Sequence, residues 1–203
     1  MYLNAVLSAL VNVVILAALP FAVYGGYHKI RRNRSLAESA RRAGLQIGDT
    51  GYLKYSIFVA IALCAVFVVW PPPLEPLVRE GSAQRQFAGV GTGVRGISLA
   101  LLYGLIKTGF AEEFLFRGLI AGSLSRRLPI LWANLLQATI FLLPHLVLLF
   151  IMPEVAALLA IVFAGALYAG WLRIKSDSII GPWLLHGAAN VATALSVAAR
   201  TSG

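Results

Sequence analysis

Two adjacent acidic residues, Glu112 and Glu113, stand within a stretch of apolar residues and are followed by Arg117. A carboxylate at the centre of a bilayer costs about 3 kcal/mol on insertion scales, so such residues usually pair with a cation or mark a functional site. Glu113 and Arg117 are at positions i and i+4 with the acid first, the favourable order for an ion pair on one helix face. Glu112 points about 100° away from Glu113 on the same helix. A carboxylate without a local counter-charge suits a general base or acid.

Two histidines also occur in apolar stretches. His145 follows Pro144, and His186 is four positions before Asn190, so His186 and Asn190 share a helix face. At about 1.5 Å per residue, Glu112, His145 and His186 all fall within about one turn of the middle of their stretches. A single histidine on an apolar face is usually a buried structural residue. That interpretation weakens when both histidines share a depth with both glutamates.

The rest of the composition indicates an all-α, polytopic membrane helix bundle. Of the 203 residues, 59% are hydrophobic and 12% are charged, which excludes an ordinary soluble domain. Cys64 lies in an apolar run, where packing explains it better than chemistry. We expect about six transmembrane helices, at Leu3–Tyr24, Tyr55–Trp70, Ile97–Leu124, Ile130–Ile151, Val155–Ile174 and Ile179–Ala199.

The basic residues predict the orientation of these helices. They gather in the connections between the first and second, third and fourth, and fifth and sixth stretches, and include Lys29, Arg31, Arg32, Arg34, Arg41, Arg42, Arg126, Arg127, Arg173 and Lys175. The positive-inside rule makes these connections cytoplasmic, so both termini are expected outside and the site is expected to open toward the cytoplasm. The net charge of +9 is therefore explained by basic residues that anchor the loops at the membrane surface, and no nucleic-acid partner is expected. Residues Ser35–Gly48 are either a short amphipathic helix on the inner surface or a solvated basic loop.

Three motifs in order resemble those of the CAAX-protease and bacteriocin-processing (ABI, CPBP) family of intramembrane proteases. They are Glu112-Glu113-xxx-Arg117, Phe141-xxx-His145 and His186-xxx-Asn190, and the segment Phe163–Gly170 also resembles the glycine-containing segment between the last two. The resemblance implies a four-helix catalytic core over residues 96–203. Residues 1–95 form an N-terminal two-span region, with a basic cytoplasmic loop and an outer loop, that carries no family motif.

The resemblance also implies hydrolysis of a peptide bond. Glu112 would be the base that activates water, His145 would orient that water, and His186 and Asn190 would form the oxyanion hole. The pair Glu113–Arg117 would be structural, and Phe141 would pack. Zinc is the mechanistic rival, with Glu112, His145 and His186 as ligands. We favour the version without a metal or other cofactor, because Asn190 suits an oxyanion donor and no His-Glu-x-x-His helix is present.

The expected partners are membrane lipid and a peptide or protein substrate. A prenylated CAAX protein, a bacteriocin-like leader or a C-terminally tagged secreted protein would each fit. The expected location is a bacterial or archaeal plasma membrane. Two other functions stay open: a non-catalytic bacteriocin-immunity or binding protein on the same scaffold, and a proton-coupled transporter. No inverted repeat of the kind found in transporters is visible in the sequence.

Overall fold

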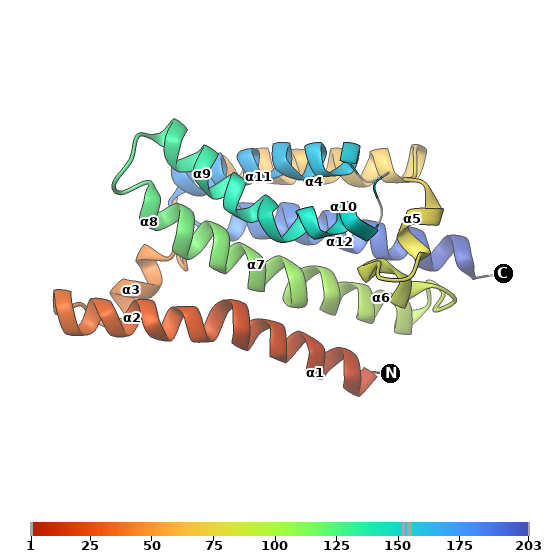
Figure 1. The fold of residues 1–203 in the computed structure, drawn as a ribbon, viewed down its shortest axis with the longest axis horizontal. Helices are drawn as coiled ribbons and strands as arrows, with labels where there is room; N and C mark the ends of the chain where they lie inside the picture. Colours follow the sequence, from red (N-terminus) through yellow and green to blue (C-terminus); the bar gives the residue numbers. More distant parts are fainter. Residues whose placement is uncertain (1, 152, 154–155, 203) are drawn as a thin grey trace.

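The computed structural model describes residues 2–151, 153 and 156–202, and these residues form a bundle of helices without a strand. The all-α prediction is therefore confirmed. The long helices run side by side along the long axis of the molecule, and the chain begins and ends at the same end of the bundle (Figure 1).

The first half of the chain supplies two of the long helices. α1 (Tyr2–Val13) continues through a π-helical stretch, Val14–Ala18, into α2 (Leu19–Arg32), so that one helix of 31 residues results. The elements that follow are the short α3 (Leu36–Arg42), a 3-10 turn (Thr50–Tyr52), the long α4 (Leu53–Val69), α5 (Leu74–Val78) and a second 3-10 turn (Ala83–Phe87).

The second half supplies four long helical segments. The first of these four is the third long helix of the chain, and it runs from Val94 to Leu124. It consists of α6 (Val94–Leu101), a π-helical stretch (Leu102–Phe110), α7 (Ala111–Glu113), a second π-helical stretch (Phe114–Ala121) and α8 (Gly122–Leu124). The others are α9 (Ile130–Leu142) with a 3-10 stretch (Leu143–Val147) and α10 (Leu148–Ile151), then α11 (Ala156–Ser176) and α12 (Ile180–Thr201). Pro144 cannot continue the α-helical hydrogen-bond ladder, which explains the tighter stretch at this position.

Five of the helices in the described ranges are long and apolar enough to cross a membrane: Tyr2–Arg32, Thr50–Val69, Val94–Leu124, Ile130–Phe150 and Ala156–Ser176. They match five of the six expected spans, although Val155 lies outside the described residues. α12 has 22 residues but is not among the five, since His186, Asn190 and many small residues make it less apolar. It nevertheless lies along the other long helices in the bundle (Figure 1).

α12 is held close to its neighbours by glycines. It packs against α4 and against the stretch Leu102–Phe110. A Cβ atom on Gly104 would lie 2.9 Å from the carbonyl oxygen of Gly187, and one on Gly109 would lie 3.3 Å from the Gly187 Cα. Only hydrogen fits in these gaps, so the helix that carries His186 lies directly against the helix that carries the two glutamates.

Polar side chains join α9 to α11. Asn134 donates to the carbonyl oxygen of Leu167 over 2.9 Å, and Gln137 donates to that of Ala166 over 2.9 Å. Both amide groups lie against Gly170, where no Cβ would fit. These bonds set the position of α9, which carries Phe141 and leads to His145.

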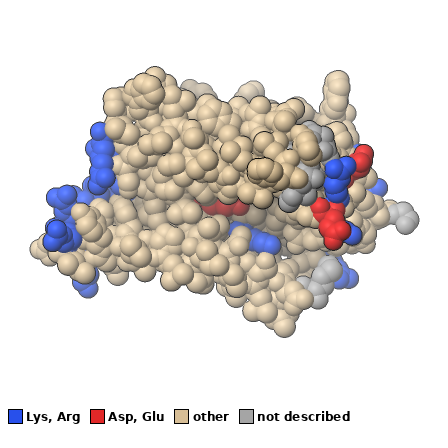
Figure 2. Space-filling model, in the orientation of Figure 1, with Lys and Arg blue, Asp and Glu red and all other residues tan. Residues whose placement is uncertain are grey.

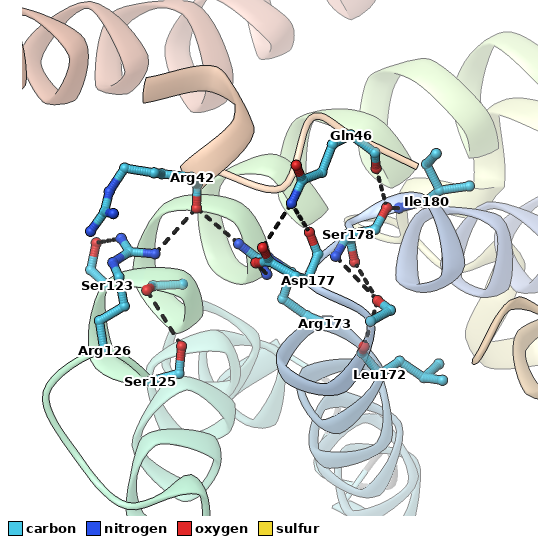
Figure 3. A network of polar contacts seen from close by, with 12 residues as sticks. Arg42, Gln46, Ser123, Ser125, Arg126, Leu172, Arg173, Asp177, Ser178 and Ile180 are labelled. Atoms are coloured by element: carbon cyan, nitrogen blue, oxygen red, sulfur yellow. Dashed lines mark hydrogen bonds and ion pairs between the residues drawn. The ribbon is translucent and has the colours of Figure 1, made fainter. Parts of the chain in front are cut away.

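At the end of the bundle opposite the termini, the segment after α3 is docked onto the helices. Ser35 caps α3 and forms a reciprocal capping box with Glu38. The carbonyl oxygen of Arg42 then accepts hydrogen bonds from Arg173 (2.9 Å) and Arg126 (3.2 Å), and Figure 3 shows how these guanidinium groups converge on it. The expected short helix therefore exists, and the alternative of a solvated loop is wrong for Leu36–Arg42.

The docking continues along residues 44–48. The Ser178 hydroxyl donates to the carbonyl oxygen of Gln46 over 2.6 Å, and Gln46 donates to Asp177, which is paired with Arg173 over 2.8 Å (Figure 3). Gly48 has a φ of +66° and lies against the carbonyl oxygen of Ser176. The basic side chains gather around this end, as the left side of Figure 2 shows.

Candidate active site

The centre of the site is the buried ion pair between Glu113 and Arg117. Arg117 Nη1 lies 2.9 Å from Glu113 Oε1, and the two side chains are 2% and 1% exposed. The i, i+4 spacing had predicted this pair, and the third long helix presents both groups toward the interior. Glu113 Oε2 and Arg117 Nε have no hydrogen-bond partner in the described part of the chain.

Glu113 has a second partner that the sequence spacing did not reveal. His186 Nδ1 lies 2.7 Å from Glu113 Oε1. A carboxylate can only accept hydrogen bonds, so Nδ1 carries the proton and donates. The same carboxylate oxygen therefore holds a guanidinium from its own helix and an imidazole from α12. This contact determines the orientation of the His186 ring.

Glu112 lies on the other side of the imidazole. Its Oε2 atom is 3.9 Å from His186 Nε2, and its side chain is 20% exposed. This distance is too long for a hydrogen bond and leaves room for another group to bridge the two atoms. Among the described residues Glu112 has no other ion-pair partner. The structure thus separates the two glutamates into a buried, paired carboxylate and a more accessible one.

Asn190 lies one turn after His186 and is held by a residue that the sequence analysis did not select. Its Nδ2 atom donates to Thr108 Oγ1 over 2.8 Å, and the Thr108 hydroxyl donates to the carbonyl oxygen of Tyr103 over 3.0 Å. Thr108 is four residues before Glu112, on the same long helix. A hydroxyl side chain at this depth could have indicated a site residue. Threonine is common in membrane helices, however, so its presence alone does not distinguish Thr108.

Phe141 forms the wall between the remaining groups. The Arg117 guanidinium lies 4.1 Å from its ring centre, and the ring centres of His145 and His186 lie 4.8 Å and 6.1 Å away. The Phe141 ring therefore packs against these groups, which is the role expected for it. Because its ring contacts both histidines and the buried arginine, Phe141 links three of the elements that build the site.

His145 reaches this wall but makes no direct polar contact with the glutamates. Its Nδ1 atom lies 2.9 Å from the carbonyl oxygen of Phe141 and therefore donates to it. The Nε2 atom is left as a hydrogen-bond acceptor. Within the described ranges no hydrogen bond or ion pair joins His145 to Glu112 or His186.

The three residues named as zinc ligands do not converge into a metal site. In the part of the chain that the structure describes, no group of three or more His, Cys, Asp and Glu side chains is arranged to hold a metal ion. The Nδ1 atoms of His186 and His145 donate to Glu113 and to a backbone carbonyl, so the Nε2 atom of each ring is not used by these bonds.

At the basic end, toward which the site was expected to open, the residues next to the docked segment are buried. Ser178 is 2% exposed and bonded to Gln46. Gly118 is buried, and a Cβ there would lie 2.7 Å from the carbonyl oxygen of Ala43. The docked segment after α3 covers these residues, and its backbone carbonyls accept hydrogen bonds from Arg173 and Ser178. The direction in which the site opens stays a prediction.

The motif-bearing part of the chain matches a known family. Residues 94–192 match the family described as Rce1-like, the type II CAAX prenyl endopeptidases, and this range contains all three motifs. The match confirms the resemblance drawn from the motif residues. No curated protein and no solved structure matches the chain significantly.

Proposed function

We propose that this chain, whose residues 94–192 match the Rce1-like family, cleaves peptide bonds by means of a glutamate-activated water. The family indicates a CAAX-type protease, and the five long apolar helices indicate an integral membrane protein. One observation supports the proposed activation of water by a glutamate. Glu112, which is partly accessible, lies 3.9 Å from an imidazole whose other nitrogen is held by a buried carboxylate.

Glu112 is the general base of the proposed reaction. A base must be ionised, reachable by water and free of a permanent cation, and its neighbour Glu113 fails the last two conditions because it is buried against Arg117. Glu112 takes a proton from the water as the water attacks the peptide carbonyl. When the tetrahedral intermediate collapses, the C–N bond breaks and Glu112 gives this proton to the leaving amine nitrogen. The acceptor nitrogen of His145 would orient that water.

His186 and Asn190 stabilise the oxyanion that forms. His186 can donate from Nε2 only in its doubly protonated form, because Nδ1–H is already directed at Glu113. In that form the two carboxylates are balanced by one guanidinium and one imidazolium, and the cluster is neutral before substrate binds. Asn190 adds a neutral donor, and its bond to Thr108 directs the carboxamide.

The proposal includes no metal, because the side chains that would have to ligate zinc do not converge. The test is to measure bound zinc and turnover on the same preparation, with and without a chelator. Activity that disappears on chelation and returns with one zinc per chain would overturn the proposal.

The decisive variant is Glu112→Gln. It keeps the shape of the side chain but cannot accept the proton, so hydrolysis should fall to background while thermal unfolding stays near that of the wild type. Glu75→Gln, on an exposed helix remote in the sequence, is the matched control. Near-normal turnover by purified Glu112→Gln would remove Glu112 from the mechanism.

The same pair of variants tests whether the protein acts by catalysis, and single cysteines test its orientation. A non-catalytic immunity or binding protein would keep its cellular effect in Glu112→Gln, whereas a protease would lose it. We retain the bacterial or archaeal plasma membrane as the proposed location, with both termini outside. Modification of single cysteines placed near residue 2 and near Lys175 would distinguish the two sides.

A further inference from the structure

The basic end of the bundle holds a group of arginines whose charge is not balanced, apart from the cluster of glutamates and histidines. The carbonyl oxygen of Arg42 accepts from Arg126 and from Arg173. A Cβ atom on Gly122 would lie 2.9 Å from Arg173 Nη2 and 3.4 Å from Arg126 Nη1, so these two guanidinium groups are close together. Asp177 pairs with Arg173, but no carboxylate in the described ranges pairs with Arg42 or Arg126. Two like charges therefore await a counter-ion.

The Arg42 side chain has donors that no residue of the described chain uses. Its guanidinium group forms no hydrogen bond there, and its Nε atom is buried without a partner. Figure 3 shows this side chain extending to the same side as Arg126 and Ser123. A buried donor without an acceptor is costly, so Arg42 is expected to meet an acceptor from outside the chain.

Two hydroxyl groups lie beside these arginines. Arg126 Nη2 donates to Tyr24 Oη over 3.0 Å and to Ser123 Oγ over 3.3 Å. Both oxygens are acceptors in these bonds, and no described residue accepts the proton of either hydroxyl. Each hydroxyl can therefore donate to a ligand. We call these four side chains the guanidinium–hydroxyl cluster: Tyr24, Arg42, Ser123 and Arg126.

The position of the cluster along the helices favours a lipid headgroup. About 20 residues cross the hydrocarbon core of a bilayer, whereas the first and third long helices have 31 residues each. Tyr24 belongs to the part of the first helix that leads to Arg32, and Ser123 is next to Leu124, the last residue of the third. The cluster thus lies near the level of the headgroups, at the end where basic side chains gather (Figure 2). Basic pockets between membrane helices at this level bind anionic headgroups.

We propose that the guanidinium–hydroxyl cluster binds the phosphate of an anionic phospholipid. Guanidinium groups match phosphate oxygens in geometry, and the two hydroxyls supply further donors. A zwitterionic lipid is a poorer ligand, because its own cationic group would adjoin two arginines that lack a counter-ion. The bound lipid joins α2, the docked segment after α3 and the end of the third long helix. The inference is independent of the proposed function, since Glu112 has no part in it.

The test measures binding of phosphatidylglycerol, with a fluorophore on one acyl chain, to the full chain in dodecylmaltoside micelles by fluorescence anisotropy. Arg42→Gln should weaken this binding about tenfold or more, as expected for loss of one charge-assisted hydrogen bond. Arg41→Gln is the matched control, because it removes the same charge from the exposed neighbouring residue. It should leave binding near that of the wild type, as should Glu112→Gln.

Two competitors distinguish a lipid from a soluble phosphate. Unlabelled phosphatidylglycerol should displace the probe, whereas inorganic phosphate at the same concentration should not. Displacement by inorganic phosphate would assign the cluster to a soluble ligand and overturn the proposal. Equal binding of phosphatidylglycerol and labelled phosphatidylcholine would also overturn it. So would equal weakening by Arg41→Gln and Arg42→Gln, because the attraction would then be that of a diffuse basic surface.

A second variant keeps the test decisive if Arg42→Gln does not fold, which thermal unfolding of each preparation would reveal. Tyr24→Phe combined with Ser123→Ala removes both hydroxyl donors but leaves every arginine in place. This double variant should weaken binding of phosphatidylglycerol severalfold, by the loss of two neutral hydrogen bonds. Wild-type affinity in a folded double variant would overturn the proposal.

Discussion

Replacing Arg117 by methionine should destabilise the protein by removing the cation that balances Glu113. The methionine keeps most of the apolar stem, so the main change is a carboxylate with 1% exposure that has lost its guanidinium. Breaking a buried ion pair in this way costs about 3–5 kcal/mol. For a chain of this size that corresponds to a fall in the unfolding temperature of about 6–20 °C.

A second substitution isolates the charge from the packing. Arg117 also covers the Phe141 ring at 4.1 Å, and losing that cation–π contact costs about 0.5–2 kcal/mol whatever happens at Glu113. The double variant Glu113→Gln with Arg117→Met removes the uncompensated charge but keeps a carbonyl oxygen that can accept from His186. It should therefore recover most of the lost unfolding temperature and retain only the smaller deficit.

The assay is thermal unfolding in detergent, followed by tryptophan fluorescence, for the wild type, both single variants and the double variant. The cycle gives the coupling energy between the two residues directly. A single Arg117→Met variant that unfolds at the wild-type temperature would refute the reasoning. A double variant no more stable than Arg117→Met alone would do the same.

Other expectations concern the oxyanion donors and the docked segment. Asn190→Ala should lower kcat about 10²–10³-fold, and Thr108→Val, which removes the acceptor that orients the carboxamide, should lower it by a smaller factor; unchanged kcat in both would exclude Asn190 as a donor. Gly48→Ala should lower the unfolding temperature by the equivalent of about 1–2 kcal/mol, because φ is positive there and the Cβ would meet the Ser176 carbonyl. Gly26→Ala should not lower the unfolding temperature, because a Cβ added there has nothing within 4 Å. Equal unfolding temperatures of the two variants would show that Gly48 is unstrained.

The features that could be predicted from the sequence are those encoded over short distances along the chain. The apolar runs predicted the long helices to within a few residues, except that the first continues past Tyr24 to Arg32. The spacing of Glu113 and Arg117 predicted their pair. The 3-10 stretch at Pro144 is also explained by the sequence, because proline lacks the backbone donor that the α-helical ladder requires. Each of these depends on one helix alone.

The features that could not be predicted join helices far apart in the chain. The bond from His186 to Glu113 spans 73 residues, and that from Asn190 to Thr108 spans 82. Periodicity indicates which residues share a face but not which face of another helix they meet. Charge patterning likewise predicts the side of the membrane on which a loop lies, but not that residues 44–48 would dock against Ser176 and Ser178.

The two arginines that meet at the Arg42 carbonyl have a consequence for synthesis of the chain. Arg173 donates to a carbonyl 131 residues earlier, so at about 5–20 residues per second the ribosome supplies this partner roughly 7–26 s after Arg42 itself. Of the two arginine partners of the Arg42 carbonyl, only Arg126 is made earlier in that interval, 84 residues after Arg42, so the segment is docked incompletely until Arg173 follows. A nascent chain that stops before Arg173 should therefore expose this segment to proteases that the finished protein resists.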